Sequence, residues 1–300
     1  MFVVLLFALT AIAGQTGFNR AEDGADTDFM VKWKDADSKS QSVRFTLPTR
    51  AVKSDLAIGL GFPKKASSAA QVAAEKRYAK TLPKGVKLKA KPDGNGGVRL
   101  SVSARSRGDA KDALRGAKEV QEKALDEFLD EHEWTELKKD HIIPDHARLA
   151  RLYADDVAPV AEALRAGTRS SRDYAARALS FVQSIPYEKR KGGGGKGYRR
   201  PVSLLAANKG DCDGKSVLFL ALMRAAYPEV DGAMVYIKNH AFVGLALEPE
   251  KGELTFRQDG VRYVMADPVG PALSALGDGG KKSKRRVVLG AIQVRAVADG

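Results

Sequence analysis

The sequence GDCDGKS occupies residues 210–216, and a mostly apolar run from Val217 to Ala226 follows it. Cys212 is the only cysteine among the 300 residues, and it stands where glycines and aspartates give way to a helical pattern of apolar residues. Unpaired backbone N–H groups and a partial positive charge at a helix N-terminus favour an anion. The stretch therefore predicts a thiol at the first turn of a buried helix, where the thiolate is favoured.

The two aspartates beside the cysteine act in the opposite direction. Carboxylates at Asp211 and Asp213 raise the pKa of a neighbouring thiol. An ordinary thiol, with a pKa near 8.5, is only about 3% thiolate at pH 7. The helix alone is therefore insufficient to activate Cys212, and a cationic partner is required.

Two residues further along the chain complete a candidate catalytic set. His240 lies in KNHAFV at residues 238–243, and Asp267 lies in MADP at residues 265–268. In a triad of this kind the cysteine attacks an acyl carbon, the histidine takes its proton, and the carboxylate orients the imidazole. We predict that Cys212, His240 and Asp267 have these three roles.

The order and context of these residues resemble the transglutaminase-like branch of the papain-type thiol enzymes. The motifs that carry the resemblance are GDCD before a helix containing LMR, NHAF opening a strand, DP ending a strand, and FVQSIPY upstream, all within residues 168–275. The resemblance implies an α+β fold with a papain-like core, in which the helix bearing the cysteine packs on an antiparallel sheet. It also implies cysteine-dependent acyl transfer on a peptide or protein amide.

Hydrolysis by a peptidase or amidase is the predicted reaction, and two alternatives stay open. One is a cross-linking transglutaminase, and the other is a non-catalytic module of the same fold that binds anionic or cell-envelope ligands. The backbone N–H of Cys212 would hold part of the oxyanion, and Asn208 is the candidate for a second donor.

Metal and nucleotide chemistry are not predicted. His132, His141 and His146 stand among acidic residues but lack a recognised ligand spacing, so we assign no metal ligand and no cofactor. GDCDGKS superficially resembles a phosphate-binding loop, but the pattern G-x-x-x-x-G-K-[ST] requires glycine at position 209, where this chain has Lys209.

Composition and the N-terminus bear on partners and location. The net charge of +13 predicts affinity for anionic surfaces, such as a cell-envelope polymer or lipid head groups, without indicating specific nucleic-acid binding. Residues 1–13 form an apolar run that ends in Ala11-Ile12-Ala13, an A-x-A cleavage pattern, although no cation precedes Arg20. We predict an exported protein, with a membrane anchor or a buried strand as alternatives for this segment.

The predicted organisation is a signal peptide at residues 1–13, an accessory α+β and helical region at 14–166, and a transglutaminase-like domain at 167–300. The segments predicted for the accessory region are an unstructured leader 14–27, strands 29–33 and 42–47, a helix 66–80, strands 86–91 and 98–103, and a helical region 108–166. The transglutaminase-like domain is predicted to begin with a helix 172–184 and a cationic glycine loop 189–200 that is a lid or a surface insertion. It continues with four strands of an antiparallel meander at 233–237, 240–248, 254–258 and 261–266, a basic loop 277–286, and a last strand within 287–297. Lys84, Lys87, Lys89 and Lys91 are interpreted as a solvated strand face.

Overall fold

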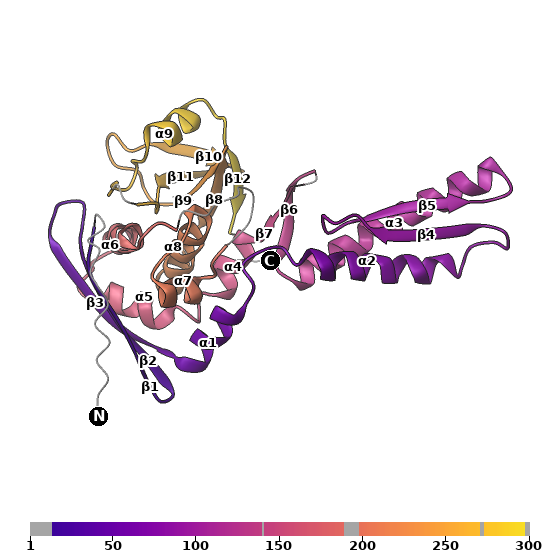
Figure 1. Cartoon of the computed structure of the whole chain (residues 1–300). Helices are drawn as coiled ribbons and strands as arrows, with labels where there is room; N and C mark the ends of the chain where they lie inside the picture. The colour runs from indigo at the N-terminus through magenta and orange to yellow at the C-terminus, as the bar shows by residue number, and fades with distance from the viewer. Residues whose placement is uncertain (1–13, 140, 189–197, 271–272, 298–300) are drawn as a thin grey trace. The chain divides into compact units, whose positions relative to one another are not determined.

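The computed structural model describes residues 14–139, 141–188, 198–270 and 273–297 (Figure 1). The described chain forms two compact units. The first combines residues 14–58 with 146–188 and 198–297, and the second comprises residues 59–139 and 141–145. The predicted signal peptide and most of the cationic glycine loop lie outside the described residues.

The chain mixes helices with antiparallel sheets, in agreement with the α+β class at its coarse level. The unit that holds the candidate triad includes residues 14–58 in addition to most of the segment 167–300. Among the described residues, no helix is long and apolar enough to cross a lipid bilayer.

A three-stranded antiparallel sheet opens the first unit. Its strands are β1 (Gln15–Asp23), β2 (Asp26–Lys34) and β3 (Ser40–Pro48), in the order β1-β2-β3, and α1 (Thr49–Ala57) follows. The prediction of an unstructured leader at residues 14–27 is wrong, because most of this segment is β1. This strand lies at a sheet edge, and both of its faces are largely exposed. Its sequence is therefore mostly polar and lacks the alternation of apolar and polar residues that predicts a strand.

Trp33 of β2 joins this sheet to the helices of the first unit. Its side chain is fully buried, its indole N–H donates to Ser180 Oγ at 3.0 Å, and its ring meets the edge of Phe181. Trp33 is therefore a core residue of the first unit.

Helix α8 is the centre of the first unit. The helices of this part are α4 (His146–Leu152), α5 (Ala158–Arg165), α6 (Ser171–Ser184), α7 (Pro201–Ala207) and α8 (Cys212–Ala226). The other four helices and strands of the following sheet all contact α8, and Figure 1 shows it enclosed by them. Every residue from Gly214 to Met223 is buried, which explains why this helix is apolar on all sides from Val217 to Met223.

A five-stranded antiparallel sheet covers α8. Its strands are β8 (Gly232–Ile237), β9 (His240–Leu245), β10 (Thr255–Gln258), β11 (Val261–Ala266) and β12 (Gln293–Ala296), in the order β10-β11-β9-β8-β12. The predicted simple meander is wrong, because β9 pairs with β11 and leaves β10 at the edge.

The predicted basic loop at 277–286 is largely the helix α9 (Lys281–Val288). This helix buries only Ser283 and Val287, so its cationic sequence shows little of the apolar periodicity that predicts a helix.

The second unit contains two long helices and two hairpins. Its elements are α2 (Lys64–Ala79), β4 (Lys87–Pro92), β5 (Val98–Ser103), α3 (Arg107–Glu131), β6 (Trp134–Lys138) and β7 (His141–Pro144). Ala113, Ala117, Ala124 and Phe128 form the buried face of α3, as their helical spacing predicts. The helical pattern predicted through residue 166 is interrupted by the β6-β7 hairpin, which is a correction.

Candidate active site

Local packing at the start of α8 fixes the position of Cys212. Asp211 is the N-cap, and its Oδ1 accepts a hydrogen bond from the Gly214 N–H at 2.9 Å. A Cβ on Gly214 would lie 2.8 Å from the backbone oxygen of Arg199, so this position requires glycine. Cys212 is therefore the first residue of the helix, as the sequence predicts.

The segment 186–188, which precedes α7 in the chain, contacts Gly210 just before α8. Gly210 donates from its N–H to the Pro186 carbonyl at 3.2 Å and accepts at its own carbonyl from the Glu188 N–H at 2.8 Å. These bonds hold Tyr187 beside Gly210 as a parallel bridge. The Tyr187 side chain reaches Cys212, and the two share a hydrogen bond.

His240 and Asp267 meet at the ends of neighbouring strands. Asn239 has a φ of +62°, a conformation that asparagine tolerates, and the turn it forms places His240 at the first position of β9. Asp267 directly follows β11. His240 Nε2 lies 3.0 Å from Asp267 Oδ2. Since a carboxylate only accepts, Nε2 carries the proton and Nδ1 is the acceptor of the neutral ring.

The carboxylate of Asp267 is held from several sides. It is buried, and its Oδ1 accepts from the Val269 N–H at 3.3 Å. The Ser283 hydroxyl donates to Oδ2 at 3.5 Å. These contacts fix the oxygen that faces the imidazole.

The sulfur of Cys212 lies against the start of β9. The backbone N–H of Ala241, the residue after His240, forms a hydrogen bond with Cys212. The structure thus brings His240 and Asp267 into direct contact and brings the cysteine to the chain next to His240.

Burial opposes ionisation of the thiol. It is the largest cause that raises the pKa of Cys212, and the carboxylates of Asp213 and Asp211 raise it further. The N–H groups of Ala241 and Asp213 lower it, with a smaller effect. The predicted need for a cationic partner therefore becomes stronger in the folded protein.

Sequence reasoning missed Lys215, one turn along α8 from the cysteine. Its side chain is fully buried, and Nζ donates to the Gln183 carbonyl at 3.3 Å. Burial lowers the pKa of Lys215 to about 7, and the nearby charge of Asp267 acts in the opposite direction. Gln183 also donates from Nε2 to the carbonyl oxygens of Asp267 at 2.8 Å and Ser274 at 3.0 Å, so it joins α6 to the carboxylate segment.

Asn208, the candidate oxyanion donor, has its side chain engaged elsewhere. It ends α7 in the left-handed conformation, and its amide exchanges two hydrogen bonds with Gln15 of β1, at 2.8 and 3.0 Å. The role of Asn208 as an oxyanion donor stays a prediction. Tyr187 is the last residue of the FVQSIPY motif, and its place in that motif is the sequence signal that points to it.

The three other histidines have other partners. His132 Nδ1 contacts the Phe128 carbonyl at 2.9 Å, and its ring stacks on Phe128. His141 begins β7, whereas His146 is buried in the first unit with Nδ1 3.0 Å from the Tyr236 hydroxyl. Among the described residues, no group of three metal-ligating side chains is present.

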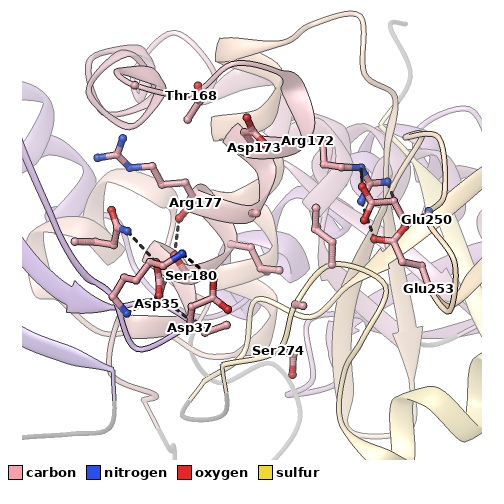
Figure 2. Close-up of a pocket in the computed structure, with 18 of the residues that line it drawn as sticks. Asp35, Asp37, Thr168, Arg172, Asp173, Arg177, Ser180, Glu250, Glu253 and Ser274 are labelled. Carbon is pink, nitrogen blue, oxygen red and sulfur yellow. Dashed lines mark hydrogen bonds and ion pairs between the residues drawn. The ribbon is translucent and has the colours of Figure 1, made fainter.

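A pocket of about 800 Å³ opens elsewhere in the first unit, between α6 and the loops after β2 and before β10. Figure 2 shows Arg172 directed at Glu250 and Glu253, and its ion pairs with them measure 3.4 and 2.7 Å. None of Cys212, His240 and Asp267 lines this pocket.

Comparisons with known protein families, with curated proteins and with solved structures found no match to this chain. The nucleotide-binding interpretation finds no support in the local structure either. The segment before the GDCDGKS sequence is the helix α7 rather than a strand, and Lys215 is buried rather than directed at a ligand.

Replacement of Tyr187 by phenylalanine tests whether its hydroxyl stabilises the thiolate. Burial raises the pKa of Tyr187 to about 12, so the hydroxyl keeps its proton at pH 7 and can donate it in a hydrogen bond to the sulfur. Loss of one such bond is expected to slow iodoacetamide alkylation of Cys212 at pH 7 about five- to tenfold. Tyr78→Phe in the second unit is the control, and equal rates in the two variants would contradict the assignment.

Proposed function

We propose that this protein is a thiol hydrolase with a transglutaminase-like, papain-like core, acting on amide bonds. The observation that carries the proposal is the 3.0 Å contact between His240 Nε2 and Asp267 Oδ2, beside a cysteine at the first turn of α8. The Ala241 contact with Cys212 supports it, because it brings the chain next to His240 to the sulfur. A nucleophile, a base and a carboxylate that orients the base are the groups that acyl transfer needs.

In the first half of the reaction, Cys212 transfers its proton to His240 Nδ1, and the sulfur attacks the amide carbon. The backbone N–H of Cys212, at the start of α8, stabilises the oxyanion together with a second donor. Tyr187 is a candidate for this donor because its hydroxyl already contacts the cysteine. The C–N bond then breaks, the leaving amine takes the proton from the imidazolium, and a thioester remains.

In the second half, a water molecule gives a proton to His240 and attacks the thioester carbon. The C–S bond breaks, the carboxylic acid is released, and the imidazolium returns its proton to the sulfur. An amine in place of water would give cross-linking, and the reaction product distinguishes the two. Peptide amides of the cell envelope are the substrates that the predicted export signal favours.

A second candidate function is a non-catalytic binding module of the same fold. The observation that favours it is the partly buried thiol, since burial raises the pKa of Cys212. In that case, cysteine would be a small core residue without chemistry.

The pH dependence of thiol alkylation separates the two functions. A thiolate–imidazolium pair reacts with iodoacetamide with an apparent pKa well below 8, whereas an inert buried thiol reacts only at higher pH. The same protein is then assayed on a panel of peptide and muropeptide amides, with Cys212→Ala as the control for background hydrolysis. An alkylation pKa above 8 together with equal turnover by the wild type and the alanine variant would reject the enzyme.

A further inference from the structure

The outward face of α9 combines positive charge with exposed apolar side chains. Ser283 and Val287 are the buried residues of this helix, and Val287 packs on the sheet with Val235 and Phe242. At about 100° per residue, the positions 281, 282, 285, 288 and 289 lie within about 60° of the opposite direction. We call the side chains at these five positions the α9 face.

The apolar part of the α9 face is Val288 with Leu289, at the end of the helix. They are 72% and 63% exposed, and they are the two most exposed large apolar side chains among the described residues. They are also adjacent in sequence, so the exposed apolar surface of the α9 face is concentrated at one end of the helix. A surface helix gains nothing from exposing them to water, which makes such a patch an indicator of a contact surface.

The cationic part surrounds this patch. Lys281, Lys282 and Arg285 lie on the α9 face, and Lys284 and Arg286 flank it. Lys282 reaches the Lys238 carbonyl, and Lys284 pairs with Asp278 at 2.9 Å. Lys281, Arg285 and Arg286 have no ion-pair partner within the described part of the chain, so their charge is available to a ligand.

We infer that the α9 face docks on an anionic phospholipid bilayer, with Val288 and Leu289 inserted between the head groups. Helices with basic residues around an apolar face bind at the lipid–water boundary. Their apolar side chains are buried there, and their cations are attracted to the anionic head groups. A soluble polyanion would account for the cations but gives no reason for the two exposed apolar side chains. The inference is independent of the proposed reaction, because none of the five side chains belongs to the candidate active site.

The experiment is co-sedimentation of the full-length chain with vesicles of 30% phosphatidylglycerol in phosphatidylcholine, compared with pure phosphatidylcholine. The charge variant Lys281→Gln/Arg285→Gln/Arg286→Gln is expected to bind the anionic vesicles about a hundredfold more weakly, at about fivefold for each cation. Its control is Lys87→Gln/Lys89→Gln/Lys91→Gln, which removes the same charge from exposed positions of β4 and should bind like the wild type.

The apolar variant Val288→Ser/Leu289→Ser keeps every charge and is expected to lose about tenfold or more in binding. All proteins carry the same residues 1–13, so lipid binding by that segment is common to every variant and cancels in the comparison. Each altered side chain is exposed, and circular dichroism verifies that the fold is kept.

Three outcomes would overturn the inference. Equal losses in the charge variant and the β4 control would show a general effect of net charge. An apolar variant that binds like the wild type would indicate a polyanion site instead of a lipid surface. Conversion of a dimer to a monomer by the apolar variant, measured by sedimentation velocity, would make the α9 face a contact between copies of the chain.

Discussion

A protein with His240→Asn is expected to hydrolyse amides at least about a thousandfold more slowly than the wild type, measured as kcat/KM. The reason lies in the electrostatics around Cys212. Burial and two aspartates raise the pKa of the thiol, and the opposing N–H groups are weaker. Without an imidazole to take the proton, the thiolate fraction at neutral pH becomes small, and the leaving amine has no acid.

The same variant should also react more slowly with iodoacetamide at pH 7, by at least about thirtyfold, which is the ratio of thiolate between an activated thiol and an ordinary one. His141→Asn is the matched control, since His141 is an exposed histidine of β7 in the second unit. Wild-type turnover in His240→Asn would contradict the role of His240 as the base. A loss of turnover with unchanged alkylation would instead assign His240 to a later step, the protonation of the leaving amine.

The elements of the candidate site could be predicted from the sequence because each rests on a local signal. An N-cap aspartate and the apolar run after it predict that Cys212 begins a helix. A two-residue turn before a mostly apolar segment predicts that His240 begins a strand, and β9 does begin there. The contact between His240 and Asp267 then depends on strand pairing, and β9 and β11 are neighbours although the predicted meander would have separated them.

The parts that could not be predicted depend on distant contacts or lack an apolar signal. Lys215 follows Asp213 and Gly214 at a helix start, where lysine is normally solvated, and its burial depends on Gln183 of another helix. Strand β1 is polar on both faces, so periodicity has nothing to detect. Helix α9 buries only Ser283 and Val287, and its five cations masked this weak helical pattern.

The Lys215→Met variant is expected to lose a large part of the pH dependence of stability above neutral pH. In the folded protein burial lowers the pKa of Lys215 from its usual 10.5 to about 7. Between these two values the unfolded chain binds the proton and the folded chain does not, so the free energy of unfolding rises with pH. From pH 7.5 to 9.5 this group alone contributes a rise of about 2.5 kcal/mol. Methionine has no such group, and its side chain of similar length fills the same buried space.

Urea unfolding at pH 7.5, 8.5 and 9.5 measures how the free energy of unfolding changes with pH. The wild-type protein and the Lys215→Met variant both carry Trp134→Phe in this experiment. Trp33, buried in the first unit, is then the only tryptophan of the chain and reports the unfolding of the unit that contains Lys215. Lys251→Met, at an exposed lysine of the same unit, is the control and should keep the wild-type slope. A wild-type slope in Lys215→Met would mean that Lys215 stays protonated in the folded protein. Its charge would then be compensated across this pH range by Asp267 and the Gln183 carbonyl, making the ammonium a permanent counter-ion of the carboxylate that orients His240.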